Sequence, residues 1–123
     1  MQNNHKQPKI ILVGAAGNLG RTIVKQALDS GFTLSVFGRS RAQFLDLHGG
    51  TLPSGLRVIE GNIFDETVTA RAIAGHDTLI NAAGNAANGD SFYKLCQVIL
   101  KQAELHLEAP KRAWFLGGTA ALE

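Results

Sequence analysis

The sequence predicts an α/β fold, a doubly wound parallel sheet of about five strands with helices on both faces. Short apolar runs alternate with segments of helical periodicity five times along the 123 residues. The first run, residues 9–13, is apolar enough for a strand buried on both faces of a sheet. Small, glycine-rich turns follow the runs, where parallel sheets bind their ligands. With right-handed crossovers and a reversal after the third strand, these three observations predict the strand order 3-2-1-4-5.

Local signals place the elements of the first half of the chain. After the first strand, a helix is expected to run to a glycine stop at Gly31. Its apolar face comprises Leu19, Ile23, Val24, Ala27 and Leu28. Residues 33–37 predict the second strand. Ser40 and Gln43 then form a capping box, which predicts a short helix to about residue 47. Residues 48–55 are rich in glycine and turn formers and predict a surface loop.

The second half repeats the alternation. Strands are expected at residues 56–59, 78–80 and 113–116. Asp65 can cap a helix that ends at Gly75. A longer helix is expected over residues 91–108, and Pro110 prevents its continuation. The inner face of this helix comprises Phe92, Cys96, Ile99, Ala103 and Leu107.

The turn after the first strand carries the main functional signal. Residues 14–20 read G-x-x-G-x-x-G, between a buried strand and the start of a helix. Gly14 permits a tight exit from the strand, Gly17 leaves room for a pyrophosphate, and Gly20 allows close packing of helix on sheet. The helix N-terminus offers free N–H groups and a partial positive charge to phosphates. The turn therefore predicts dinucleotide binding; a Walker-type loop is excluded because no Gly-Lys-Ser/Thr follows at the required spacing.

The end of the second strand indicates which dinucleotide is bound. NAD-binding folds place an acidic residue there to hold the ribose 2′-hydroxyl group. This chain has Gly38 and Arg39 instead. An arginine can pair with a 2′-phosphate and stack on adenine, so NADP is favoured over NAD, and Arg41 can assist. If both arginines were only solvated residues, their charge at a helix start would be mildly unfavourable.

Four segments carry a resemblance to a known family. They are the glycine turn, Gly38-Arg39, residues 61–65 after the third strand and residues 81–84 after the fourth. The chain thereby resembles short-chain dehydrogenase/reductases. It is most similar to their atypical and extended branches, which are NAD(P)H-binding, NAD-dependent epimerase/dehydratase-like and flavin-reductase-like proteins. Residues 117–123 also match the Gly-Gly-x-x-x-Leu-Glu sequence that often ends the fifth strand in those proteins.

Carried over position by position, the resemblance implies a cofactor site along the carboxyl ends of the strands of a Rossmann-type domain. Pyrophosphate would lie against the glycine turn, the 2′-phosphate against Arg39, and the cofactor's ribose along residues 82–84. Adenine would lie beside Asn62, which stands where the family usually has Asp. Asn81 would hold backbone in place, and Thr119 would lie near the nicotinamide. The cofactor-binding candidates are Gly14, Ala16, Gly17, Asn18, Leu19, Gly20, Arg39, Asn62, Ile63, Ala82, Ala83 and Gly84.

The same resemblance shows what the chain lacks. The family's catalytic Tyr-x-x-x-Lys pair would follow the fifth strand, beyond the last residue of this sequence. Tyr93 is the only tyrosine, and Gln97 stands four residues later. We therefore expect a polar leader, residues 1–8, and a dinucleotide-binding portion, residues 9–123, that lacks the catalytic and substrate-binding segments and does not turn over by itself. The fifth strand would be an open edge, which either the rest of a longer protein or a second copy of the chain would cover.

Two functions are consistent with these residues. The first is the NADP(H)-binding domain of a short-chain dehydrogenase/reductase-like oxidoreductase or epimerase/dehydratase. The alternative is a non-catalytic, NADP-binding redox sensor, which would lack the tyrosine and lysine altogether. A flavodoxin-like FMN domain is disfavoured, because FMN has no adenosine 2′-phosphate to account for Arg39.

Composition argues against other classes of partner and site. A hydrophobic content of 45% and a charged content of 18% are globular values. The net charge of +2 is dispersed and gives no reason to expect nucleic acid or a membrane surface as a partner. No apolar run approaches the roughly 18 residues of a membrane span, and no signal-peptide core is present, so a cytoplasmic location is expected. With one cysteine, Cys96, and four scattered histidines, no disulfide or metal site is expected.

Overall fold

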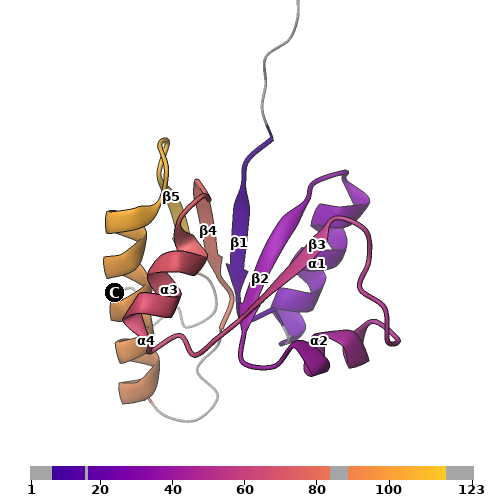
Figure 1. The fold of residues 1–123 in the computed structure, drawn as a ribbon, viewed down its shortest axis with the longest axis horizontal. Coiled ribbons are helices and arrows are strands. Elements are labelled where there is room, and N and C mark those ends of the chain that lie inside the picture. The colour runs from indigo at the N-terminus through magenta and orange to yellow at the C-terminus, as the bar shows by residue number, and fades with distance from the viewer. Residues whose placement is uncertain (1–6, 16, 84–88, 116–123) are drawn as a thin grey trace, which may run out of the picture.

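The computed structural model describes residues 7–15, 17–83 and 89–115, in which strands and helices alternate (Figure 1). The strands are β1 (Ile10–Val13), β2 (Leu34–Gly38), β3 (Leu56–Glu60), β4 (Thr78–Asn81) and β5 (Arg112–Phe115). The helices are α1 (Asn18–Asp29), α2 (Arg41–Leu47), α3 (Glu66–Ile73) and α4 (Gly89–His106).

The strands form one parallel sheet in the order β3-β2-β1-β4-β5, which confirms the predicted fold class and topology. Val13 at the end of β1 lies opposite Phe37 of β2 and Asn81 of β4. These strands therefore end at one level, and the turns that follow them meet at one edge of the sheet. This edge is where a doubly wound sheet binds its ligand.

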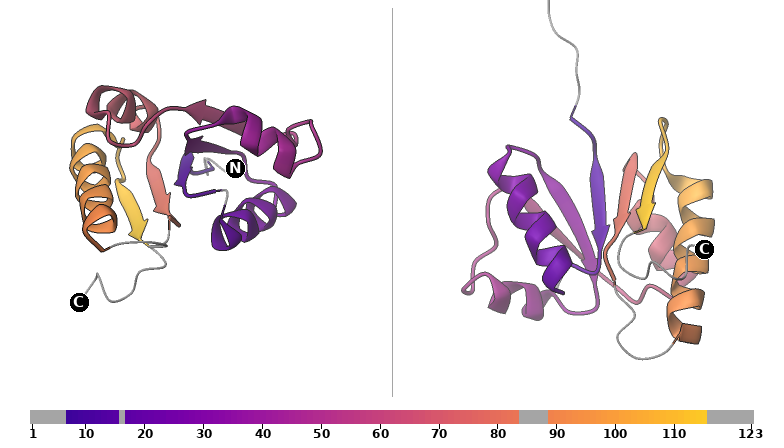
Figure 2. Two further views of the ribbon diagram at one scale, coloured as in Figure 1. Left: turned by 90° about the horizontal axis from the view of Figure 1, so that it is seen from below. Right: turned by 180° about the vertical axis from the view of Figure 1, so that it is seen from behind.

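Apolar side chains pack on both faces of the sheet, because alternate residues of a strand point to opposite sides. Helices α3 and α4 cover one face and α1 and α2 the other (Figure 2). Under α3 and α4 the buried cluster includes Ile11, Val13, Phe37, Ile73, Leu79 and Ile99. Under α1 and α2 it includes Leu12, Val24, Leu34, Val36 and Phe44.

Both predicted helix caps of the short helices are present. Ser40 Oγ accepts a hydrogen bond from the backbone N–H of Gln43 at 3.2 Å. Asp65 Oδ1 accepts one from the backbone N–H of Val68 at 3.2 Å. Each cap pairs one of the N–H groups that a helix start leaves without an intrahelical partner, so these local signals set where α2 and α3 begin.

The structure corrects several details of the expected elements. Leu19 was expected on the inner face of the first helix but is 42% exposed, whereas Val24 is buried as expected and Gly20 is buried as well. Helix α4 begins at Gly89 and ends at His106, two residues earlier at each end than expected. Cys96 is only half-buried, and burial raises the pKa of its thiol. The side chain of Phe92 and residue 116, expected in the core and in the fifth strand, lie outside what the structure describes.

Strand β5 pairs with β4, and no other strand is paired with it among the described residues. The Trp114 side chain on this strand is 57% exposed. Leu100 and Leu105 of α4 are also exposed. Exposed apolar side chains therefore occur on β5 and on α4 at this end of the sheet.

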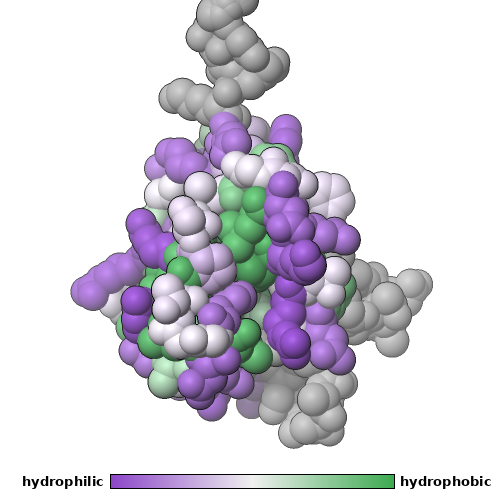
Figure 3. All heavy atoms as spheres, turned by 90° about the vertical axis from the view of Figure 1, so that its right-hand side faces the viewer, coloured by the Kyte–Doolittle hydropathy of each residue, from purple (hydrophilic) through white to green (hydrophobic). Residues whose placement is uncertain are grey.

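A second apolar region lies on the side of the molecule formed by α1, α2 and β3. Figure 3 shows a hydrophobic band there, bordered by strongly hydrophilic residues. A cleft of about 680 Å³ runs between α1 and the segment that links α2 to β3, and its apolar lining includes Val24, Leu28, Leu47 and Pro53. This cleft runs along α1 from Asn18, one of the predicted site residues, to Asp29.

Candidate functional site

The turns after β1, β2, β3 and β4 enclose a cavity of about 290 Å³ at the carboxyl edge of the sheet. Four of the predicted site residues, Gly14, Arg39, Ile63 and Ala83, line it. Its other lining residues are Val13, Ala15, Phe37, Gly38, Gln43, Phe44 and Gly61. A mostly apolar cavity with a few polar groups is typical of small-molecule and cofactor sites.

Gly14 and Gly20 are required by the fold itself. Gly14 has a φ of +85°, and a Cβ atom there would lie 2.3 Å from the backbone nitrogen of Ala83. A Cβ atom on Gly20 would lie 2.1 Å from the carbonyl oxygen of Gly14. These two glycines allow β1, β4 and α1 to approach within backbone contact, so their presence is explained without any ligand.

Gly17 differs from the other two glycines of the turn. Its backbone is extended, with φ −78° and ψ 173°, which any residue can adopt. Among the described residues, a Cβ atom there would meet a single neighbour, the carbonyl oxygen of Gly14, at the ordinary contact distance of 3.8 Å. The fold therefore accommodates a side chain at Gly17, and the glycine leaves open the space in front of the α1 N-terminus.

The N-terminus of α1 has the features of an anion-binding helix start. Its N-cap is Gly17, which has no side chain that could cap the helix, and the first turn contains no acidic residue. Asn18 and Leu19 are exposed there. Because the first N–H groups of a helix have no intrahelical acceptor, they and the helix dipole favour an anion at this position.

Arg39 lies in the short turn between β2 and α2, where its side chain is exposed and lines the cavity together with Gln43. The Phe44 ring packs against Gly38, and a Cβ atom on this glycine would lie 2.7 Å from the ring. Among the ion pairs of the described residues, none involves Arg39. The guanidinium group is thus placed at the cavity with no carboxylate partner in that part of the chain.

Glu60, at the end of β3, was not identified from the sequence. It lies opposite Gly38 in the sheet, and its Oε2 accepts a hydrogen bond from the backbone N–H of Arg41 at 3.2 Å. This carboxylate therefore stabilises the start of α2 and brings a negative charge close to the Arg39 turn. Gln43, Phe37 and Phe44 were also missed as cavity residues.

Asn81, expected to hold backbone in place, and Asn62, expected beside adenine, have different environments. Asn81 is fully buried, and its Oδ1 accepts a hydrogen bond from the backbone N–H of Ala83 at 3.1 Å. It therefore holds the turn after β4, as expected. Asn62 is exposed, and its Oδ1 accepts a hydrogen bond from the backbone N–H of Phe64 at 3.0 Å. Ile63 beside it is buried, and its carbonyl oxygen accepts a hydrogen bond from the Thr69 hydroxyl at 2.7 Å.

The remaining predicted residues are placed as follows. Ala82 is buried in the cluster under α1 and α2. Ala16, Gly84 and Thr119 lie outside the described residues. Tyr93 is 61% exposed on α4. Within the described ranges, no group of three or more potential ligands could hold a metal ion, and no helix has the length and apolar character needed to cross a membrane.

A doubly wound sheet whose first strand ends in a glycine turn over a helix N-terminus defines a Rossmann-type dinucleotide-binding domain. A family model described as NAD(P)H-binding matches residues 14–109, most of the chain. The chain therefore belongs to this NAD(P)H-binding family, in agreement with the resemblance seen in the sequence.

Individual proteins are similar over part of their length. Photosystem II assembly factor Ycf39 from Synechocystis is 35% identical over 77 residues, which make up 61% of this chain and 22% of Ycf39. The structure of WbmG from Bordetella bronchiseptica, in complex with NAD and UDP, has a TM-score of 0.63 and 20% identity and covers 81% of this chain and 34% of WbmG. A short-chain dehydrogenase/reductase from Veillonella parvula has a TM-score of 0.64 and 17% identity, with 89% of this chain and 47% of that protein covered. The chain thus spans less than half of each, and the two structures show a shared fold.

Proposed function

We propose that the chain is the NADP(H)-binding portion of a short-chain dehydrogenase/reductase-like oxidoreductase or epimerase/dehydratase. The observation that carries the proposal is Gly17. The fold has room for a side chain at this position, so the glycine is best explained by a ligand that needs the space in front of α1. The pyrophosphate of a dinucleotide is such a ligand, because it is an anion and must approach the backbone closely.

In this proposal different residues bind different parts of the dinucleotide. The N–H groups at the start of α1, from Asn18 to Gly20, and the backbone of Ala16 and Gly17 hold the pyrophosphate. Adenine occupies the apolar cavity beside Asn62 and Ile63, and the cofactor's ribose lies along residues 82–84. The nicotinamide supplies the hydride chemistry, and the chain's own part is to bind and orient the dinucleotide.

Arg39 supports NADP as the preferred cofactor. Its guanidinium group lies at the cavity and is not engaged in an ion pair among the described residues. A 2′-phosphate would supply the missing partner through charge-assisted hydrogen bonds. Glu60 disfavours NADP, because its negative charge lies at the start of α2, close to Arg39, and repels a phosphate.

The domain boundaries and assembly belong to the same proposal. Residues 9–123 would form the dinucleotide-binding portion, after a polar leader over residues 1–8, and would need further residues for turnover. The partial coverage of the similar proteins supports this assignment. In the absence of such residues, the exposed edge of β5 with Trp114 would favour pairing with a second copy of the chain.

A non-catalytic, NADP-binding sensor is the second candidate. It is favoured by the similarity to Ycf39, which is named as an assembly factor and not as an enzyme. The two candidates share the cofactor site and differ in turnover.

Calorimetric titration of the purified chain with NADPH and with NADH tests the shared site. Saturable binding with NADPH the tighter ligand is expected, and the absence of saturable binding by a folded chain would remove both candidates. Hydride transfer from NADPH by the full-length protein to carbonyl or flavin acceptors is the next measurement. Turnover by that protein supports an oxidoreductase, whereas tight binding without turnover is expected both for the sensor and for an epimerase/dehydratase, whose cofactor is not consumed.

A further inference from the structure

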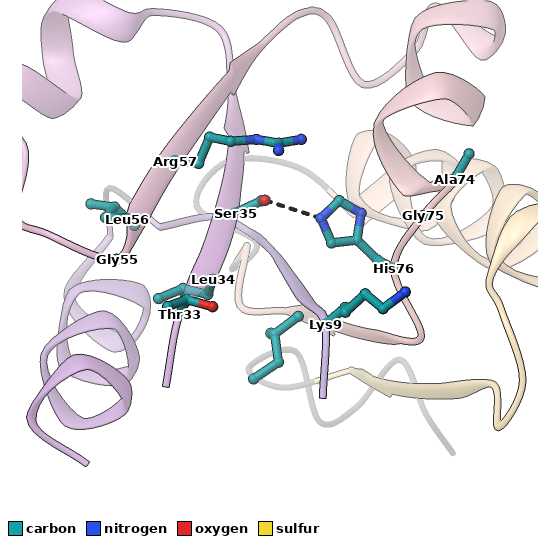
Figure 4. A pocket seen from close by; sticks show the side chains of 11 residues that line it. Lys9, Thr33, Leu34, Ser35, Gly55, Leu56, Arg57, Ala74, Gly75 and His76 are labelled. Carbon is teal, nitrogen blue, oxygen red and sulfur yellow. Dashed lines mark hydrogen bonds between the residues drawn. The ribbon is translucent and has the colours of Figure 1, made fainter. Parts of the chain in front are cut away.

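Another cavity, of about 560 Å³ and with a polar lining, lies at the opposite edge of the sheet from the glycine turn. Figure 4 shows the side chains that line it. It is lined by the amino-terminal parts of β1, β2 and β3 and by the segment that links α3 to β4. Its charged lining residues, Lys9 and Arg57, are both basic, and its other polar side chains are those of Thr33, Ser35 and His76.

The sheet register explains why polar groups gather here. Ser35 lies opposite Ile11 on one side and Arg57 on the other, so the three residues share one row across adjacent strands. Two residues further along the same strands, the row contains Phe37 and Ile59, which belong to the apolar cluster under α3 and α4. In the row of Ile11, Ser35 and Arg57, only Ile11 belongs to that apolar cluster, so the face becomes polar at Ser35 and Arg57.

His76 and Ser35 form the inner wall of the cavity. The Nε2 atom of His76 lies 3.0 Å from the Ser35 hydroxyl oxygen, and the His76 side chain is only 7% exposed. Within the described part of the chain, its Nδ1 atom has no hydrogen-bond partner of ordinary geometry. Burial lowers the pKa of His76; the Ile73 carbonyl opposes that effect and the positive charge of Arg57 adds to it.

Arg57 is the charged residue of this cavity for which the described residues provide no ion-pair partner. Lys9 Nζ forms an ion pair with Glu108 at 3.0 Å, and the Lys9 backbone N–H faces the Asp77 carboxylate at 3.3 Å. Asp77 also accepts a hydrogen bond from the Thr78 hydroxyl at 2.7 Å. The nearby carboxylates are therefore directed to other groups. Arg57 enters no ion pair among the described residues, and its side chain points over β2 toward the Ser35–His76 pair (Figure 4).

We propose that this cavity is a second ligand site, which binds a small oxyanion, a phosphate or carboxylate group, between the Arg57 guanidinium and the Ser35–His76 pair. The anion supplies the charge partner that Arg57 lacks among the described residues, and it accepts a hydrogen bond from the Ser35 hydroxyl or from a protonated His76 ring. Because the anion favours the charged imidazole, its binding is coupled to proton uptake by His76. This site is separate from the proposed cofactor site and does not depend on it.

The test is a titration of the full chain, labelled with ¹⁵N at histidine, with sodium phosphate at constant ionic strength, followed by the imidazole NMR signals. We expect the His76 signals to move saturably and its pKa to rise with phosphate, while the other histidines respond little. A parallel titration with acetate distinguishes the two oxyanion types: a saturable response to one alone assigns the class, and a response to both assigns a general oxyanion site.

Arg57→Gln is the decisive variant, because Arg57 is exposed and its replacement leaves the core intact. It is expected to weaken the phosphate response of His76 about tenfold or more, and Arg71→Gln on α3 serves as the matched control with an unchanged response. The His76 response is also expected to persist in chain saturated with NADPH. An equal response in Arg57→Gln, a response lost on NADPH saturation, or the absence of a saturable response to either anion would overturn the proposal.

Discussion

Gly20 in the first turn of α1 packs directly on the backbone of Gly14 at the end of β1, so closely that a Cβ atom on Gly20 would lie 2.1 Å from the Gly14 carbonyl oxygen. This contact fixes the start of α1 against the carboxyl edge of the sheet. The N–H groups of the helix are thereby directed at the space that Gly17 leaves open.

Gly20→Ala is expected to destabilise the chain, because the new methyl group would force α1 away from β1. The free energy of unfolding in urea should fall by about 1–3 kcal/mol, the usual cost of overpacking. Wild-type stability in this variant would show that the contact between α1 and β1 is looser than described.

Arg39→Ala is expected to weaken NADPH binding by about 10- to 100-fold while changing NADH binding much less, because only NADPH carries the 2′-phosphate. Calorimetric titration with both cofactors measures the difference. Arg71→Ala, an exposed arginine in the last turn of α3, is the control for a simple loss of charge. Equal weakening of both cofactors by Arg39→Ala would contradict the assignment of Arg39 to the 2′-phosphate.

Glu60→Gln tests the carboxylate at the start of α2. Removing its negative charge is expected to increase the preference for NADPH over NADH, because the charge lies beside the Arg39 turn. The amide oxygen of glutamine can still accept the N–H of Arg41, so stability should fall by less than about 1 kcal/mol. An unchanged ratio of the two dissociation constants would show that Glu60 has only the capping role.

Asn81→Ala is expected to lower the free energy of unfolding by about 1–3 kcal/mol, because it removes a fully buried side chain and leaves the half-buried N–H of Ala83 without its acceptor. Asn62→Ala removes a similar hydrogen bond to the next turn but at an exposed position, where water can replace it. Urea unfolding should therefore show a clearly larger loss for Asn81 than for Asn62. Similar losses would argue against a buried anchoring role for Asn81.

The stability of the chain is expected to fall as the pH drops below about 6.5, the ordinary pKa of histidine. Burial lowers the pKa of His76 in the folded chain, so the unfolded chain binds more protons in the window between the two pKa values. The contribution of neutral His76 to stability is therefore complete above the pKa of this histidine in the unfolded chain. It is lost as the pH falls toward the lower pKa in the folded chain. Urea unfolding at several pH values measures this slope, which His76→Gln should reduce; an identical slope in the variant would exclude His76 as its source.

The fold could be predicted well because its signals are local. The apolar runs, the Ser40 and Asp65 caps and the glycine stops lie next to the elements that they define. Leu19 was misplaced because helical periodicity alone does not show how the first turn of α1 faces the sheet. The strand order followed from handedness rules that apply to all sheets of this type.

The site could be predicted only in part, because some of its residues meet through the sheet register. Glu60 lies near the Arg39 turn because β3 pairs with β2 and brings it opposite Gly38. Gln43 and Phe44 reach the cavity only because α2 folds back beside β2. The sequence also shows three glycines in one motif, but only the structure separates Gly14 and Gly20, which the fold requires, from Gly17.

The most direct test of the proposed cofactor site is the NADPH affinity of Gly17→Ala, measured by calorimetry beside its urea unfolding curve. The fold has room for this methyl group, so the free energy of unfolding should stay within about 1 kcal/mol of the wild-type value. NADPH binding should weaken by about tenfold or more, because the methyl group occupies the space assigned to the pyrophosphate. A folded Gly17→Ala variant that binds NADPH as tightly as the wild-type chain would contradict the account.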